Sequence, residues 1–247
     1  MMVLTAAPAH AQPAEMSARG LDAIEILKKV DNATKTVQTV QYTGRLEGKA
    51  AADSRTLLVE GTVLLSGWVE TGTRPLRGVP KRYRCDITTT DRHSGKTRRL
   101  AIGADGESFY LIDHDAKKIY AGSTPDVLGS ISRPAVALWM REFIHPEPFS
   151  DEINGDDQVL RGSKRIGDED CHEIHIIYKG AIGEAFWWFS KRDFLPRGVQ
   201  RVMNTPAGER AIQQWQITNL VADPKLGEDA FKLVIPDGYQ KVEGNAP

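Results

Sequence analysis

Two stretches decide the fold class, Thr39–Lys49 with the sequence TVQYTGRLEGK and Thr56–Trp68 with the sequence TLLVEGTVLLSGW. Both are rich in the β-branched, aliphatic and aromatic residues that favour strands. Two further runs of this kind follow at Lys81–Thr90 and Lys96–Ile102, and no helical pattern separates them. Consecutive strands joined without a crossover helix pair antiparallel. The sequence therefore predicts an antiparallel sheet.

The strand pattern continues along the chain. Ser108–Ile112 and Lys117–Tyr120 read as a hairpin, and the polar residues Asp113, His114 and Asp115 at its tip are typical turn residues. Five more strands are expected, each bounded by turn residues, at Gln158–Ile166, Asp170–Lys179, Glu184–Lys191, Arg197–Met203 and Arg210–Val221. The sequence therefore predicts about eleven strands in one curved antiparallel sheet.

Two segments have the spacing of helices instead. From Leu21 to Val37 apolar residues recur at steps of three and four, which predicts an amphipathic helix. The stretch Ser132–Ile144 predicts one short apolar helix, with Ser132 as N-cap and Pro134 near its first turn. We expect both helices to cover one face of the sheet.

Several segments, taken in order, resemble the LolA-like superfamily of lipoprotein carriers. They are the first helix leading into Tyr42, Thr43 and Gly44, the strand start Pro80–Arg84, the hairpin Asp105–Asp113, the strand Cys171–Tyr178 followed by Trp188–Arg197, and the ending Asp223–Tyr239. The resemblance implies a half-open antiparallel β-barrel with a helical lid over an apolar cavity that can hold acyl chains, without catalysis. The carrier has a lid-latching arginine beside the early proline, where this chain has Val79.

The overall composition is that of a globular protein. Of the 247 residues 40% are hydrophobic, and 32 basic residues against 33 acidic ones give a formal net charge of −1. A nucleic-acid-binding protein normally carries an excess of basic residues, and this chain has none, so the composition does not indicate nucleic-acid binding. Residues 1–14 fit the tail of a secretory signal with the cleavage triplet Ala9–Ala11, the alternative being a disordered native N-terminus. We expect residues 15–247 to form a single exported, periplasmic domain.

The cysteines and their neighbours offer two further possibilities. Cys85 and Cys171 could form a disulfide in an oxidising compartment, or remain two buried thiols. Cys171, Glu173 and His175 alternate onto one face of a strand, but three such residues without a fourth ligand are a weak metal motif. We therefore expect no metal and no cofactor.

The candidate ligand site rests on apolar residues in two regions. Trp139, Met140 and Phe143 would form an apolar, adaptable face on the short helix. The strand around Glu184–Ser190 carries four consecutive aromatic residues, so both of its faces must meet apolar material. The full set of cavity candidates is Trp139, Met140, Phe143, Ile174, Ile176, Tyr178, Phe186 and Trp188. The alternative is that these side chains simply pack as core.

Three functions remain in competition. The first is a periplasmic protein that holds a lipid, an acyl chain or a lipoprotein, as a carrier or a sensor. The second is a regulatory module that uses the same concave face to bind an inner- or outer-membrane envelope protein. The third, a hydrolase or metal enzyme, requires converging polar groups, and the chain contains no phosphate loop, nucleophile elbow or paired CxxC motif. We expect a protein that is not an enzyme.

Overall fold

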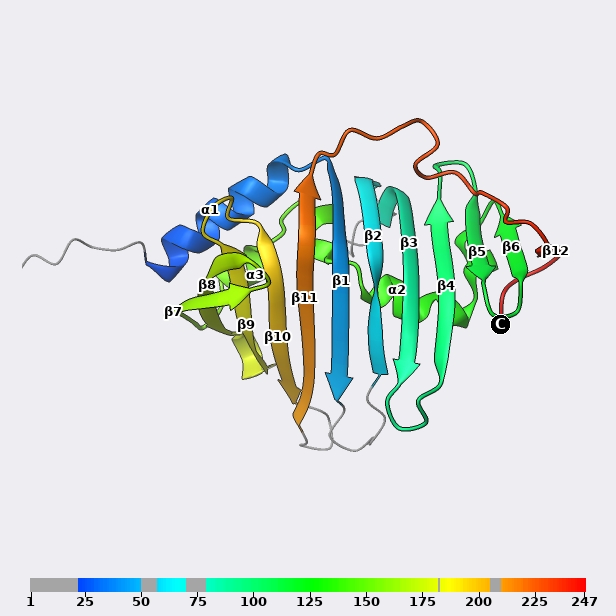
Figure 1. Ribbon diagram of the computed structural model, residues 1–247. Coiled ribbons are helices and arrows are strands. Elements are labelled where there is room, and N and C mark those ends of the chain that lie inside the picture. Colours follow the sequence, from blue (N-terminus) through cyan, green and yellow to red (C-terminus); the bar gives the residue numbers. More distant parts are fainter. Residues whose placement is uncertain (1–21, 50–56, 70–78, 182, 205–209) are drawn as a thin grey trace, which may run out of the picture.

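The computed structural model describes residues 22–49, 57–69, 79–181, 183–204 and 210–247. These residues form one 12-stranded sheet and a few helices (Figure 1). The strands are β1 (Thr39–Lys49), β2 (Leu57–Val69), β3 (Val79–Asp91), β4 (Thr97–Ala104), β5 (Phe109–Asp113), β6 (Lys118–Gly122), β7 (Asp157–Ile166), β8 (Glu169–Ile177), β9 (Gly183–Ser190), β10 (Pro196–Asn204), β11 (Arg210–Ala222) and β12 (Gln240–Val242). The helices are α1 (Ala23–Thr36), α2 (Arg133–Ala137) and α3 (Ser150–Ile153), and the 3-10 turns are η1 (Pro125–Leu128), η2 (Ser130–Ser132), η3 (Arg141–Ile144) and η4 (Lys179–Ala181).

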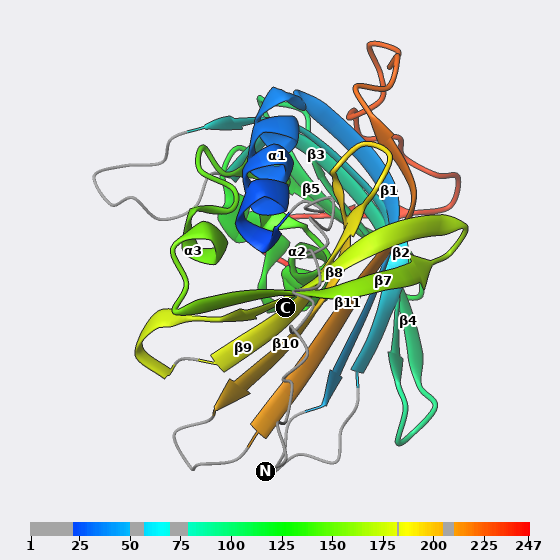
Figure 2. The same cartoon turned by 90° about the vertical axis from the view of Figure 1, so that its left-hand side faces the viewer.

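The sheet is open, because its two edge strands do not pair with each other. The strand order is β12-β6-β5-β4-β3-β2-β1-β11-β10-β9-β8-β7, and every neighbouring pair is antiparallel except β12 with β6. The sheet curves around α1, α2 and α3, which lie on its concave side (Figure 2). The predicted half-open antiparallel sheet with helices on its concave face is confirmed.

Helix α1 forms where the spacing of apolar residues predicts it. Its N-terminus has a capping box, in which the Glu25 amide donates to Asp22 Oδ1 at 2.7 Å and the Asp22 amide donates to Glu25 Oε2 at 3.3 Å. Ile26, Leu27 and Val30 are fully buried in the main core. The capping box fixes where the helix begins, and the apolar face fixes it on the sheet.

Several elements differ from the prediction, which did not include α3, η1 or η4. β12 is missed, because three residues paired in parallel with β6 are too short to show an alternating pattern. The single helix expected over Ser132–Ile144 is wrong: α2 ends at Ala137, Met140 is extended, and a separate turn, η3, follows. Ser132 does not cap a helix either, since its hydroxyl donates to the Gly129 carbonyl.

The β7–β8 hairpin folds back over the convex face of the sheet. At its tip, a Cβ on Gly167 would lie 3.5 Å from the Thr218 side chain of β11. The hairpin buries Trp188 together with Ile166 and Cys171 in a small cluster separate from the main core. Gly198 is required here, because its φ is +158° and a Cβ would lie only 2.8 Å from the Trp188 ring.

No helix in the described part of the chain is long and apolar enough to span a membrane. The predicted signal remnant, residues 1–14, lies outside the described residues.

Candidate functional site

A strap of short helical pieces crosses the concave face of the sheet. We use the name strap for residues 133–153, which comprise α2, η3, α3 and the links between them. In Figure 2 this segment lies beneath α1 and inside the curve of the sheet. None of its pieces exceeds five residues, so intrahelical hydrogen bonds contribute little and contacts from the sheet must hold it.

The first half of the strap is held by uncharged groups. The Tyr42 hydroxyl, from β1, donates to the Leu138 carbonyl at 2.9 Å and accepts from the Met140 amide at 2.8 Å. Trp215 of β11 donates to the Ala137 carbonyl at 2.8 Å. Burial raises the pKa of Tyr42 well above its usual range, so this hydroxyl stays neutral. These bonds replace the helical bonds that a continuous helix would make at 138–140.

Replacing Tyr42 by Phe tests this anchor. The change leaves the buried Leu138 carbonyl and Met140 amide without a partner, and we expect the free energy of unfolding to fall by about 2 kcal/mol. Urea denaturation followed by tryptophan fluorescence measures the change. Tyr110→Phe is the control, since it removes a single buried bond, to the Phe231 carbonyl, and should cost about 1 kcal/mol. Equal losses in the two variants would contradict a double anchor at Tyr42.

The second half of the strap is held by charged groups. Glu142 of η3 accepts a hydrogen bond from the Arg201 guanidinium of β10 at 2.9 Å, and the Glu142 side chain is only 10% exposed. The guanidinium lies over the rings of Trp187 and Trp215, 5.4 and 5.6 Å from their centroids. The nearby carboxylates raise the pKa of Arg201 even though burial acts to lower it. Arg201 is therefore a permanent cation beneath the strap.

A second buried carboxylate lies beside this pair. Glu152 of α3 accepts a hydrogen bond from the Tyr178 hydroxyl at 2.7 Å, and Tyr178 in turn accepts from Trp187 Nε1 at 3.2 Å. Burial, reinforced by the charge of Glu142, raises the pKa of Glu152 to about 7. The guanidinium of Arg201 is hydrogen-bonded to Glu142 and also acts on Glu152 through its charge, so two buried carboxylates share one buried cation.

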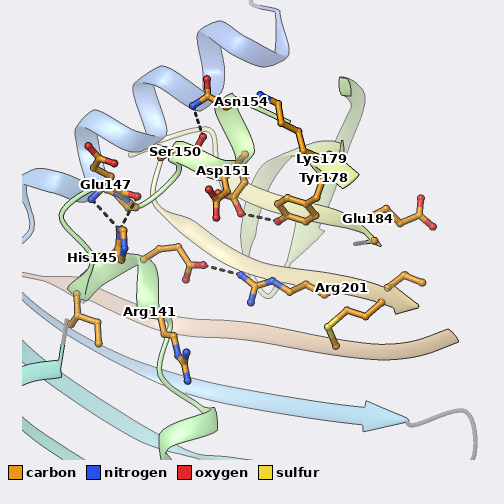
Figure 3. A pocket seen from close by; sticks show the side chains of 17 residues that line it. Arg141, His145, Glu147, Ser150, Asp151, Asn154, Tyr178, Lys179, Glu184 and Arg201 are labelled. Atoms are coloured by element: carbon orange, nitrogen blue, oxygen red, sulfur yellow. Dashed lines mark hydrogen bonds and ion pairs between the residues drawn. The ribbon is translucent and has the colours of Figure 1, made fainter. Parts of the chain in front are cut away.

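These groups lie along an open pocket of about 830 Å³ at the end of the strap (Figure 3). The pocket is bounded by η3, α3 and the ends of β8, β9 and β10, and Arg201 points from β10 toward the strap, whereas Glu184 points away. Its lining residues are Arg141, Glu142, Ile144, His145, Glu147, Pro148, Ser150, Asp151, Glu152, Asn154, Tyr178, Lys179, Gly183, Glu184, Arg201, Val202 and Met203. The pocket combines an apolar wall with several titratable groups.

The candidate residues on the strap are packed as core. Met140 and Phe143 are buried, and Trp139 is half-buried against the same cluster. Trp139 packs edge-on against Tyr83 at 4.8 Å between centroids and donates to Cys85 Sγ at 3.0 Å. The strap is therefore closed on the sheet in this structure, and none of these three side chains lines the open pocket.

The candidate residues on the strands divide between the two faces of the sheet. Ile174 and Ile176 are buried in the main core on the concave side, and Tyr178 lines the pocket. Phe186 and Trp188 point to the convex side, where Phe186 stacks on His175 at 4.4 Å and Trp188 is buried under the β7–β8 hairpin. The structure thus brings Ile174, Ile176 and Tyr178 to the strap side and separates Phe186 and Trp188 from them.

The two cysteines are free thiols, so the disulfide that the sequence left open is not formed. Cys85 lies in the main core on the concave side, whereas Cys171 lies in the convex cluster with Ile166 and Trp188. Burial raises the pKa of Cys85 to about 12 and that of Cys171 to about 11. Both behave as small buried apolar residues.

The polar neighbours of Cys171 are engaged in structural bonds. Glu173 accepts from Trp188 Nε1 at 2.8 Å, and His175 bridges Glu184 at 2.7 Å and Arg161 at 3.1 Å. Among the described residues no group of three His, Cys, Asp or Glu side chains could hold a metal ion. At the β5–β6 hairpin tip Asp113 accepts the turn amides of Asp115 and Ala116, as the turn interpretation predicts.

The sequence prediction missed three residues of the pocket: Glu142, Glu152 and Arg201. A glutamate inside the apolar stretch Val136–Ile144 was the available signal, because a charge there requires a partner if the stretch is buried. Arg201 could not be chosen in advance, since an arginine at an alternating position of a strand is normally solvent-exposed.

The fold and the pocket define the class of protein: a half-open antiparallel β-sheet whose concave face is covered by a strap. No protein-family model matches the sequence, and the search of curated proteins finds no match. Solved structures with a similar arrangement do exist. A LolA superfamily protein from Nitrosomonas europaea is 13% identical with a TM-score of 0.35, covering 87% of this chain and 99% of that one.

Two further solved structures are similar in arrangement. The lipoprotein LppX from Mycobacterium tuberculosis is 14% identical with a TM-score of 0.45, covering 83% of this chain and 97% of that one. MucB in the Pseudomonas aeruginosa MucA/MucB complex is 13% identical with a TM-score of 0.41, covering 86% of this chain but only 61% of that one. At these identities and TM-scores we draw no conclusion from the three structures. The half-open sheet that the resemblance to the LolA-like superfamily implied is observed directly in this chain.

Proposed function

We propose that the protein is a non-catalytic binding protein of the cell envelope that holds an acyl-bearing ligand, a lipid or a lipoprotein, between the strap and the concave sheet. The observation that carries this proposal is the open pocket of about 830 Å³ where the strap meets β8, β9 and β10. Its apolar wall, formed by Ile144, Pro148 and Met203, suits an alkyl chain, and its polar groups suit a headgroup.

An acyl chain that enters the pocket gains free energy by burial. Each methylene removed from water contributes about 0.8 kcal/mol. Beyond the pocket the concave face is filled by side chains such as Met140, Phe143 and Phe149. A long chain must therefore displace part of the strap, whose pieces are short and held by a few side-chain bonds.

The polar groups of the pocket support binding rather than catalysis. Glu142 is bonded to Arg201, and Glu152 is bonded to Tyr178. His175, which does lie beside the carboxylate of Glu184, is on the convex side and stacked on Phe186. These groups satisfy one another's hydrogen bonds, whereas an acid–base pair must face a substrate.

Native mass spectrometry with long-chain phospholipid or diacylated lipopeptide in detergent tests the proposal. The wild-type protein should retain one acyl-bearing molecule, and Met203→Asp should lower its retention at least tenfold, because a carboxylate in the apolar wall opposes burial of an alkyl chain. Ile212→Asp is the matched control: Ile212 is 41% exposed at the same end of the sheet, on the neighbouring strand β11, and lines no part of the pocket. Its retention should equal that of the wild type.

The filled concave face favours one second candidate, a module that binds a segment of an envelope protein along the strap. This function needs a groove rather than a deep cavity, and the open pocket can serve as such a groove. A protein that stays free of lipid under all these conditions, with Met203→Asp indistinguishable from Ile212→Asp, would reject the acyl-binding proposal in favour of this module.

A further inference from the structure

The two halves of the strap differ in how they are attached. Residues 133–140 are held by the neutral bonds of Tyr42, Trp215 and Trp139, which do not titrate near neutral pH. Residues 141–153, which we name the flap, are held by the charged contacts of Glu142 and Glu152. The extended residue Met140 separates the two halves, and it is the point about which the flap would move relative to residues 133–140.

Charge balance under the flap depends on one proton. Glu142 and Glu152 both act on one buried cation, Arg201, so ionising both glutamates places two negative charges beside a single buried guanidinium. The groups that act on Glu152 are Glu142 of η3, Tyr178 after β8 and Arg201 of β10. Helix α1, which packs on α3, carries the mutually paired Asp31 and Lys35. The other charged or titratable residues that line the same pocket are Arg141, His145, Glu147, Asp151, Lys179 and Glu184. Tyr178 cannot supply a charge, because burial raises its pKa far above neutral.

Apolar contacts of the flap are independent of pH. Phe149 is fully buried and packs edge-on against Trp187 and Phe189, with centroids 5.2 and 5.3 Å apart. Its amide donates to Asp31 of α1 at 3.4 Å. These contacts close the flap, and the charge state of the two glutamates adjusts how firmly it is closed.

We propose that the flap is a proton-controlled gate to the pocket, closed while Glu152 is protonated and loosened once Glu152 and Glu142 are both ionised, with residues 133–140 attached throughout. This regulation rests on the proposed function, since it governs access to the same pocket. A ligand would be held more firmly below neutral pH and exchanged more readily above it.

The pKa of about 7 at Glu152 supports this assignment. When the flap opens, Glu152 becomes solvated and its pKa returns toward the ordinary value of 4.5. The closed state then binds more protons than the open state between these two values. Opening is therefore favoured as the pH rises through neutrality.

Hydrogen–deuterium exchange of the ligand-free protein at pH 6 and pH 8, followed by mass spectrometry, tests the gate. After normalisation to the intrinsic rate at each pH, amides in residues 141–153 should exchange about tenfold faster at pH 8 than at pH 6. Amides in residues 133–140 should show no such change. Glu152→Gln keeps an oxygen that accepts from Tyr178 and cannot ionise, so its flap should be equally protected at both pH values.

Two further variants sharpen the test. Glu142→Gln leaves Arg201 free to pair with ionised Glu152, and the midpoint of the pH response should move to lower pH. Asp151→Asn, an exposed carboxylate on the same helix α3, should keep the wild-type response. A pH-independent flap in the wild type, or a response retained by Glu152→Gln, would overturn the gate. Because no ligand is present, failure of acyl binding would leave this result unaffected, and the two proposals can fail separately.

Discussion

Replacing Arg197 by Met should lower the free energy of unfolding by about 3 kcal/mol, because it removes the buried cation of two carboxylates and leaves them only an exposed one. The Arg197 side chain is 1% exposed at the start of β10, and its guanidinium contacts Asp193 at 2.6 Å and Glu169 at 2.9 Å. It also donates to the Leu195 carbonyl at 3.2 Å. The arginine therefore ties the β9–β10 turn to the β7–β8 hairpin.

Arg192→Met is the matched control for this prediction. Arg192 contacts the same two carboxylates, Glu169 at 3.0 Å and Asp193 at 3.6 Å, but its side chain is 71% exposed. An exposed ion pair contributes little, so this variant should lose less than about 1 kcal/mol. Urea denaturation followed by circular dichroism measures both. Losses of equal size would show that burial does not distinguish the two arginines.

The fold could be predicted from local patterns because its strands are consecutive in the sequence. Both ends of each of the eleven predicted strands lie within two residues of the ends of an observed strand. The ends of the predicted helix Leu21–Val37 lie equally close to those of α1. Turn residues such as Gly167 and Asp168 mark the strand ends directly. The break at 138–140 could not be predicted, because its cause is the Tyr42 hydroxyl, which lies about a hundred residues earlier in the chain.

The candidate site was predicted less well for a related reason. Alternation shows that Phe186 and Trp188 share a face and that Ile174 and Ile176 share a face, but it does not relate the faces of two strands to each other. The pairing register between β8 and β9 relates the two faces. Trp187 lies opposite Ile174, so Trp187 and Phe189 are the aromatic residues on the strap side. The same lack of register left the Cys85–Cys171 pairing undecided. The apolar stretch Ser132–Ile144 was recognised as a cover of the sheet, whereas α3 and the charged partners on the sheet required the tertiary structure.

The other large effect expected is on the pH dependence of stability, and it concerns Glu152. The pKa of this carboxyl is raised in the folded protein, so the folded state binds more protons than the unfolded state between the ordinary value of 4.5 and about 7. Stability is therefore lost as the pH rises through this window and stays low above it. The pKa difference corresponds to roughly 3 kcal/mol. Glu152→Gln should be more stable than the wild type by about this amount at pH 8.

At pH 5 most of this difference should be absent, since Glu152 is then protonated in the folded wild type. His172 acts in the opposite sense: burial lowers its pKa, so its contribution to stability is lost as the pH falls below its ordinary value of 6.5. Both proteins carry His172, so subtracting their unfolding free energies, measured in urea at each pH, isolates Glu152. Asp151→Asn should show no pH-dependent difference. A Glu152→Gln protein no more stable than the wild type at pH 8 would mean that the buried carboxylate is fully compensated by Arg201, and the closed flap would then have no proton to lose.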